Sequence, residues 1–113
     1  MFPSVCCGEC RHCLRGRAEA CQSLQLIGTH RQGAYADYVA VPARNAVAVP
    51  AGISPVEASA LALSGPVAQN QLTQAGFEPG MWVLVQGAAS ALGSTTATLA
   101  AHLGARVIAT SRS

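Results

Sequence analysis

The sequence predicts a mixed α/β chain in two parts, residues 1–53 and residues 54–113. Three observations lead to this prediction. Residues 33–53 alternate apolar and polar side chains with the two-residue period of β-strands. Residues 54–75 begin with the start signals of a helix. Residues 81–110 run from an apolar segment through a glycine-bounded turn and a helical segment to a second apolar segment, which is the order of a βαβ unit.

The first part combines a loop zone with a strand zone. Residues 1–32 are rich in cysteine, glycine and arginine and show no sustained periodicity, so they predict loops. The alternation that follows, around residues 35–41 and 46–49, predicts two short antiparallel strands. Pro42 and Pro50 lack the N–H that a strand ladder needs, and each predicts the end of a strand.

The second part opens with a helix signal. Ser54 and Glu57 have the spacing of a capping box, with a proline at the first helical position between them. The Gly65-Pro66 pair interrupts the helical pattern. We therefore expect one helix ending near Leu63 and a second over residues 67–75.

The remaining segments predict a strand, a helix and a strand. "MWVLVQG", residues 81–87, is short and apolar, as is typical of a buried parallel strand. "SALGSTTATLAAHLGA", residues 90–105, predicts a helix closed by Gly104, and "RVIAT", residues 106–110, predicts a second buried strand.

Four of the five cysteines have the spacing of a metal site, C-x2-C-x2-C-x7-C. Four thiolates so close in sequence can surround one ion tetrahedrally, which predicts a structural zinc at Cys7, Cys10, Cys13 and Cys21. An iron–sulfur cluster, which usually has a shorter last gap and a following proline, is the alternative. Disulfides between cysteines three apart would be strained, and a redox CxxC pair would need a strand before it and a helix after it. Cys6 is expected to be a free thiol.

Composition favours a globular chain, because 50% of the residues are hydrophobic and 11% are charged. The net charge is +2, and the one close group of arginines is expected to be a solvated rim, not a nucleic-acid surface. That group is Arg11, Arg15 and Arg17. The sequence shows no signal-peptide pattern and no apolar run near ~20 residues, so we expect a cytoplasmic protein with no membrane partner.

"CGECRHCLRGRAEAC", residues 7–21, resembles the structural-zinc lobe of the medium-chain dehydrogenase/reductase superfamily, which comprises zinc-type alcohol dehydrogenases and quinone-oxidoreductase-like proteins. Residues 24–54 are similar to the stretch that completes the GroES-like domain of that superfamily. Residues 58–113 resemble the crossing helices and the opening of its Rossmann domain. The resemblance implies a partial GroES-like domain over residues 1–53, followed by the first βαβ unit of a Rossmann dinucleotide-binding domain over residues 54–113.

"VLVQGAASALGS" lies where that superfamily has its dinucleotide fingerprint, after an apolar strand and at the start of a helix. Gly87 and Gly93 keep the first and last glycine positions, whereas Ser90 and Ala91 stand where the superfamily often has two glycines. A plain strand-to-helix turn is the alternative interpretation. The predicted cofactor-binding residues of this turn are Gly87, Ala88, Ala89, Ser90, Ala91, Leu92 and Gly93.

The end of the second strand predicts which nicotinamide cofactor is preferred. An acidic residue there would bind the ribose 2′-hydroxyl of NAD. Ser111 stands at this position and Arg112 follows it, which favours the 2′-phosphate of NADP. The expected cofactors are therefore a structural zinc and NADP, with NAD and a merely exposed arginine as the alternative.

No catalytic residue is predicted on this chain. The resemblance places one ligand of a catalytic zinc at Leu63, whose side chain cannot bind metal, and this implies the quinone-oxidoreductase-like branch, which transfers hydride without that zinc. The three histidines show no arrangement typical of a catalytic pair. They are His12, His30 and His102.

The predicted function is that of a fragment of an NAD(P)H-dependent oxidoreductase of the alcohol dehydrogenase or quinone reductase type, inactive alone. In its relatives, hydride would pass between the nicotinamide and a carbonyl, an alcohol or an activated alkene of a small-molecule substrate. The alternatives are a non-catalytic, stand-alone zinc-binding interaction module and a truncated product with no activity. Exposed edges of a two-stranded sheet would also allow a homo-oligomer.

Overall fold

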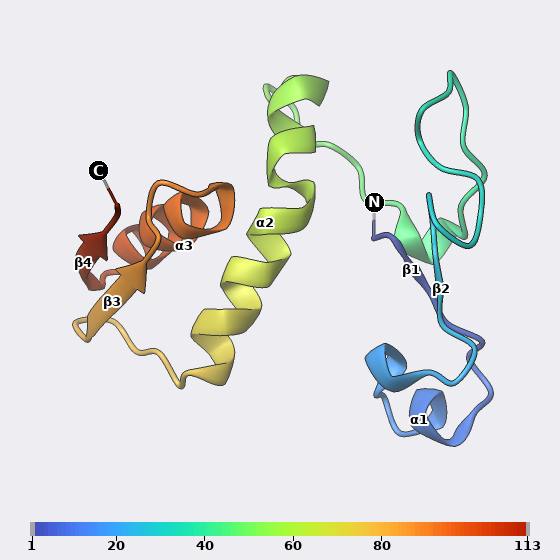
Figure 1. The fold of residues 1–113 in the computed structure, drawn as a ribbon, viewed down its shortest axis with the longest axis horizontal. Helices are drawn as coiled ribbons and strands as arrows, with labels where there is room; N and C mark the ends of the chain where they lie inside the picture. Colours follow the sequence, from blue (N-terminus) through green and yellow to red (C-terminus); the bar gives the residue numbers. More distant parts are fainter. Residues whose placement is uncertain (1, 113) are drawn as a thin grey trace. The chain divides into compact units, whose positions relative to one another are not determined.

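The computed structural model describes residues 2–112. Their contacts divide the chain into two compact units, the first ending at Ala48 and the second beginning at Val49. Each unit is described by itself (Figure 1). The sequence placed a boundary slightly later, after residue 53, and the assignment of domains on either side stays a prediction. None of the described helices is both long enough and apolar enough to cross a membrane.

The first unit contains a short antiparallel pair of strands, β1 (Ser4–Val5) and β2 (Gln25–Leu26). Between them the chain makes two short helical turns, α1 (Arg11–Leu14) and the 3-10 helix η1 (Ala18–Ala20). The expectation that this zone is all loop was therefore wrong. Elements of two to four residues cannot be stable by themselves, so other interactions must order this unit.

One buried asparagine connects the end of this unit to its beginning. Asn45, at the end of the 3-10 helix η2 (Ala43–Asn45), donates from Nδ2 to the carbonyl oxygens of Phe2, at 2.9 Å, and Ser4, at 2.7 Å. The main-chain carbonyl of Asn45 accepts from the Phe2 N–H at 2.8 Å. Among the described residues of this unit only Asn45 and Cys21 are buried. An apolar core therefore contributes little to its stability.

The two strands predicted around residues 35–41 and 46–49 are not observed in the described chain, where these segments form turns and irregular structure. Tyr35 and Tyr38 are fully exposed. Alternation predicts a strand only where a partner supplies the ladder of hydrogen bonds. The described residues offer these segments no such partner.

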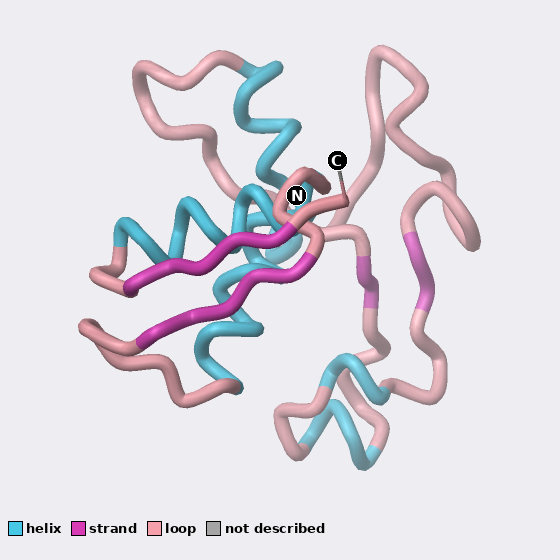
Figure 2. The backbone as a smooth tube through the Cα atoms, turned by 60° about the vertical axis from the view of Figure 1, so that its left-hand side comes forward, coloured by secondary structure: helices cyan, strands magenta, loops and turns pink. Residues whose placement is uncertain are grey.

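The second unit contains the helix α2 (Pro55–Gln74) and a strand–helix–strand unit. The latter consists of β3 (Trp82–Gln86), α3 (Ala91–His102) and β4 (Arg106–Thr110). β3 and β4 are parallel, with Trp82 opposite Arg106 and Gln86 opposite Thr110. Figure 2 shows the two strands side by side with α3 along them, and the predicted order of these elements is confirmed.

The predicted start of α2 is also confirmed. The Ser54 side chain accepts from the Glu57 N–H at 3.3 Å, and Glu57 Oε2 accepts from the Ser54 N–H at 2.9 Å. The same carboxylate accepts from the Ser54 hydroxyl at 2.7 Å. Because these bonds favour the ionised form, they hold the pKa of Glu57 below its ordinary value.

The prediction that Pro66 separates two helices was wrong, because α2 continues through it. Its buried residues Ser64, Ala68 and Leu72 are four apart and lie on one face. That face packs against α3, where Thr95 Oγ1 donates to Ser64 Oγ at 3.1 Å. The packing of this face thus stabilises α2 by more than Pro66 destabilises it.

Replacing exposed Pro66 with alanine is expected to raise the free energy of unfolding of the second unit by about 1–3 kcal/mol. Proline has no N–H to donate to the Ala62 carbonyl, and alanine would restore that helical bond. Urea unfolding followed by the fluorescence of Trp82, the one tryptophan of the chain, measures the change. Pro50→Ala, outside the helices, is the control expected to change stability by less than about 0.5 kcal/mol. An unchanged Pro66→Ala midpoint would contradict this explanation.

The two strands of the second unit bury one face only. Val83, Val85 and Val107 are half-buried or buried, whereas Trp82 and Ile108 are 65% and 49% exposed. The prediction that both strands are fully buried was thus wrong for the described chain. A two-stranded sheet with one covering helix has nothing to place on its second face.

Candidate metal centre and the cleft at the strand ends

The four cysteines of the predicted metal site come together in the first unit. Cys7 follows β1, Cys10 precedes the first turn of α1, Cys13 lies within α1, and Cys21 ends η1. Their four sulfur atoms all lie within 4.8 Å of one another. The short helical turns therefore have a clear effect, since they turn the chain so that four side chains meet at one point.

The sulfur–sulfur distances fit a tetrahedral metal. Sγ of Cys10 lies 3.6 Å from Sγ of Cys13, and Sγ of Cys7 lies 3.6 Å from Sγ of Cys21 and 3.9 Å from Sγ of Cys13. Four sulfurs about 2.3 Å from a central zinc would be ~3.8 Å apart. All five cysteines are free thiols. These three distances are close to that value, and all four sulfurs lie within 4.8 Å of one another.

Backbone hydrogen bonds and desolvation shift the pKa values of two of the four thiols in opposite directions. The N–H of Cys7 donates to Sγ of Cys21 at 3.4 Å, and the N–H of Cys10 donates to Sγ of Cys7 at 3.4 Å. Backbone N–H donors, that of Cys13 foremost, lower the pKa of Cys10 to about 6. Desolvation raises the pKa of Cys13 to about 12. Close thiols cannot all ionise against one another, so a divalent cation is what would stabilise four thiolates here.

Cys6 stands apart from this cluster, as expected for a free thiol. It is half-buried and is not one of the four residues whose sulfurs converge. Its carbonyl oxygen accepts from Nη2 of Arg44 at 3.1 Å. The predicted rim arginines Arg11, Arg15 and Arg17 are exposed, and Arg17 pairs with exposed Glu19 at 3.2 Å. A pair so exposed contributes little to stability.

The histidines make structural contacts. His30 Nδ1 accepts from the N–H of Leu26 at 3.0 Å, so it caps a turn. His12 accepts at Nε2 from Arg11 at 3.1 Å, and His102 lies in the last turn of α3. None of the three belongs to the convergent group of ligands found among the described residues.

A second feature lies in the other unit, at the carboxyl ends of β3 and β4. It is an open cleft of about 810 Å³. Ligands of open parallel sheets bind at this end of the strands. The residues that line the cleft are Gly87, Ala89, Ser90, Thr110, Ser111 and Arg112. Of the predicted cofactor residues, Ala88, Ala91, Leu92 and Gly93 do not line it and have supporting places in the turn or helix.

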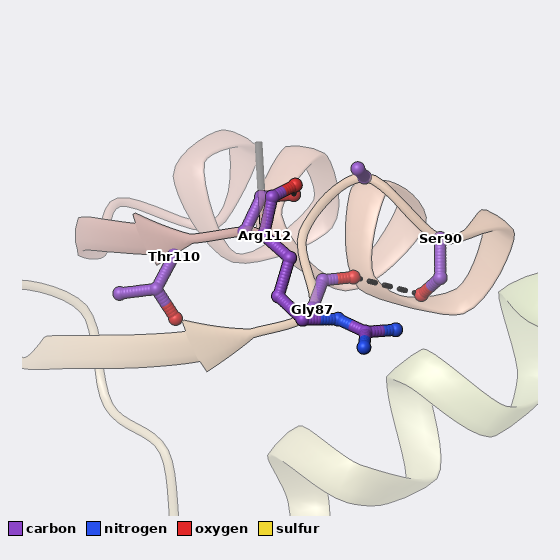
Figure 3. Close-up of a pocket in the computed structure, with 6 residues that line it drawn as sticks. Gly87, Ser90, Thr110 and Arg112 are labelled. Atoms are coloured by element: carbon purple, nitrogen blue, oxygen red, sulfur yellow. Dashed lines mark hydrogen bonds between the residues drawn. The ribbon is translucent and has the colours of Figure 1, made fainter.

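Ser90 closes the turn between β3 and α3. Its hydroxyl donates to the Gly87 carbonyl at 2.8 Å (Figure 3). The same hydroxyl accepts from the Gly93 N–H at 3.0 Å. The turn is tied to β4 by the Ala88 N–H, which donates to the Thr110 carbonyl at 2.9 Å. This helix-capping role was not predicted, although serine at the residue before the first helical position is its ordinary signal.

Gly93 is required because the first turn of α3 closely approaches the turn that follows β3. A Cβ atom at this position would lie 2.8 Å from the carbonyl carbon of Gly87 and 2.9 Å from Cα of Ala88. Both are backbone atoms, which cannot turn aside. Gly87 itself has φ of +70°, in the left-handed region that favours glycine. The two outer glycines of the fingerprint thus have different physical roles.

The turn leaves free donors beside the cleft, and a cation lines the cleft itself. The first N–H groups of a helix have no acceptor within it. Ser90 accepts that of Gly93, so those of Ala91 and Leu92 are left for solvent or a ligand. Arg112 follows the end of β4, and its side chain points toward the glycine turn in Figure 3. The positive end of a helix and a guanidinium together favour an anionic group.

Comparisons with known proteins cover both units. Residues 1–51 match the alcohol dehydrogenase GroES-like domain. Over 103 residues, or 90% of this chain, the sequence is 38% identical to L-threonine 3-dehydrogenase from Aliivibrio fischeri (strain MJ11). The matched segment is 29% of that relative, so the chain spans less than a third of its length.

Solved structures show the same likeness. An NAD-dependent alcohol dehydrogenase has a TM-score of 0.89 and 38% identity, covering 100% of this chain and 33% of that one. The cobalt- and zinc-bound thermostable alcohol dehydrogenase from Pyrobaculum aerophilum has a TM-score of 0.82 and 38% identity, covering 98% of this chain and 34% of that one. At this level of identity the likeness extends to sequence as well as to fold.

Proposed function

Because the chain belongs to the medium-chain dehydrogenase/reductase superfamily and spans only part of the length of its relatives, we propose that it is part of an NADP(H)-dependent oxidoreductase. Residues 1–53 are the zinc-bearing part of a GroES-like domain, and residues 54–113 are the first βαβ unit of a Rossmann domain. The proposed reaction is hydride transfer between the nicotinamide and a carbonyl, alcohol or activated alkene of a small molecule.

The observation that carries this proposal is the convergence of four sulfurs at the spacing of a tetrahedral zinc site, within 4.8 Å of one another. The residues that would hold the ion are Cys7, Cys10, Cys13 and Cys21. Four thiolate ligands leave no open position for a substrate, so a zinc bound there supplies structure and not catalysis. Metal analysis of the purified chain tests this part directly, with one zinc per chain expected.

The cleft at the strand ends is the proposed cofactor site. Ala91 and Leu92 follow Ser90 at the positive end of α3, beside the cleft, and their free N–H groups would bind the pyrophosphate there. Gly87, which lines the cleft, has no side chain to obstruct it. A bound nicotinamide dinucleotide supplies the hydride or accepts it. What this chain contributes is the position of the cofactor: Ser90 fixes the shape of the turn, and the Ala88–Thr110 bond fixes its distance from β4.

The end of β4 supports NADP as the preferred cofactor. β4 ends at Thr110, so Ser111 lies where a carboxylate would bind the ribose hydroxyls of NAD. Ser111 and Arg112 both line the cleft. A hydroxyl and a guanidinium there would favour a 2′-phosphate, since neither repels it and arginine can bind it through two donors.

Arg112→Ala is expected to weaken NADPH binding by about 10–100-fold and to change NADH binding less than about threefold, because a hydrogen bond to a charged group contributes about 1.5–3 kcal/mol. Calorimetric titration of the chain with each cofactor measures both values. The matched control is Arg106→Ala, because Arg106 stacks on Trp82 at 5.6 Å, at the opposite end of β4. Equal losses in the two variants, or equal losses for the two cofactors, would contradict the assignment of Arg112.

The 113-residue chain by itself is expected to bind NADPH without oxidising it. Leu63 offers no metal ligand. All residues that line the cleft come from one βαβ unit and the two residues after it, to which the proposal assigns the pyrophosphate and ribose and not the nicotinamide. The loss of NADPH absorbance with common quinones and aldehydes measures turnover. A rate above that of a protein-free mixture would show that this prediction is wrong.

A further inference from the structure

The four thiols of the cluster differ in how they meet solvent. Cys7 is exposed, Cys10 and Cys13 are half-buried, and Cys21 is 7% exposed. The exposed and the buried thiol are also a close pair, because Sγ of Cys7 lies 3.6 Å from Sγ of Cys21. Of the four residues, Cys7 is therefore the most open to a solute, and a buried cysteine lies beside it.

We propose that Cys7 is a site of oxidative modification by hydroperoxides and that Cys21 is the thiol that resolves it, so that oxidation releases the zinc. This inference rests on the proposed zinc site. It gives the cluster a role beyond structure, because the ordering of residues 2–48 would then depend on whether peroxide is present. Susceptibility of a cysteine to oxidation follows its thiolate character and its exposure.

The chemistry has two steps. The Cys7 thiolate attacks one oxygen of hydrogen peroxide: an S–O bond forms, the O–O bond breaks, and hydroxide leaves. Sulfur is oxidised by two electrons to the sulfenic acid while the peroxide is reduced. The Cys21 thiolate then attacks the sulfur of Cys7: an S–S bond forms, the S–O bond breaks, and a second hydroxide leaves. Each hydroxide takes up a proton and becomes water.

Geometry favours Cys21 over the other thiols as the resolving partner. Cys13 lies 3.9 Å from Cys7, farther than Cys21, and belongs to α1, which a new bond would distort. Cys10 and Cys13 are also 3.6 Å apart, but they are three positions apart in the sequence across the start of α1, where a disulfide would be strained. Cys6 is outside the convergent group.

Disulfide formation would remove two of the four zinc ligands. Two remaining thiolates do not make a closed tetrahedral site, so the ion would leave. The first unit has little else to order it, because only Cys21 and Asn45 are buried among its described residues. A thiol reductant together with zinc would restore the reduced cluster, since a disulfide is reversible.

The test is mapping of disulfides after one equivalent of hydrogen peroxide, with zinc release followed by a coloured zinc indicator. Cleavage after arginine places Cys21 in residues 18–31 and Cys13 in residues 12–15, and both are separate from the peptide of residues 1–11. We expect a crosslink between residues 1–11 and 18–31, assigned by fragment ions to Cys7 and not to Cys6 or Cys10, with one zinc released for each. A crosslink to residues 12–15, or complete retention of zinc, would overturn the proposal.

Two further measurements distinguish a failure of the oxidation proposal from a failure of the proposed zinc site. Cys6→Ser removes a neighbouring thiol that is not a proposed ligand, and it should leave both the crosslink and the zinc release unchanged; loss of the crosslink in this variant would overturn the role of Cys7. Zinc content is measured before peroxide is added. A chain without zinc at that point contradicts the proposed zinc site, whereas a zinc-loaded chain with the wrong crosslink contradicts the oxidation proposal alone.

Discussion

Cys13→Ser is expected to abolish tight zinc binding and to unfold residues 2–48, while the second unit stays folded. Serine has the shape of cysteine but its hydroxyl is a poor ligand for zinc, which prefers thiolate here. The sulfur of Cys13 lies 3.6 Å from that of Cys10 and 3.9 Å from that of Cys7, so it belongs to the centre of the cluster. Its loss leaves three ligands and a site open to water.

The expected effect is large because the first unit has few other sources of stability. Binding of a structural zinc supplies roughly 10–16 kcal/mol at neutral pH in small zinc domains. Against this the unit offers strands of two residues, a helix of four residues and two buried side chains. The bonds of Asn45 to Phe2 and Ser4 contribute about 1 kcal/mol each. They cannot replace the metal.

Amide hydrogen exchange of the two units measures this result. In Cys13→Ser, protection is expected to disappear from residues 2–48 and to persist in β3, α3 and β4. Cys6→Ser is the matched control, because it changes the same residue type one position from the cluster and should keep both the zinc and the protection. Protection that survives in the first unit of the zinc-free variant would show that something other than the metal orders it.

Gly93→Ala is expected to destabilise the second unit by about 3 kcal/mol and to abolish cofactor binding. The added methyl group would overlap backbone atoms of Gly87 and Ala88, the nearer of the two carbon atoms lying at 2.8 Å. Relief requires α3 to move away from the end of β3. That movement would also break the Ser90 bonds that shape the cleft.

Urea unfolding followed by Trp82 fluorescence measures the stability change. Gly65→Ala is the control, since the nearest neighbour of its added Cβ would be Cβ of Leu61 at 4.0 Å, an ordinary contact. There the gain in helix propensity is offset by the restriction on a residue before proline, and a change of less than about 1 kcal/mol is expected. Equal stability of the Gly93 and Gly65 variants would mean that helix and strand do not approach each other as described.

Local signals in the sequence predicted the parts of the fold that local interactions decide. The Ser54–Glu57 cap is an example, because both of its bonds lie within four residues. The cysteine spacing predicted the cluster for a similar reason, since four ligands within a short segment need only a few tight turns to meet. β4, residues 106–110, was predicted with its bounds because the four residues after Arg106 are apolar or β-branched and the strand is followed by a serine.

The predictions that were wrong depended on partners distant in the sequence. Pro66 is tolerated in α2 because Ser64, Ala68 and Leu72 pack against α3, which begins many residues later. The alternating segments near Tyr35 form no strand because the described chain provides no neighbour with which to pair. Neither fact is present in the local pattern, which reports the preference of a segment but not what lies beside it.

X-ray absorption at the zinc edge of the purified chain tests the central claim most directly, because it identifies the atoms around the metal. The four convergent sulfurs, all within 4.8 Å of one another, predict one zinc per chain with four sulfur neighbours at about 2.3 Å and no nitrogen or oxygen neighbour. A chain that binds no zinc, or a zinc with nitrogen or oxygen among its ligands, would contradict the four-cysteine site and the account of the first unit built on it.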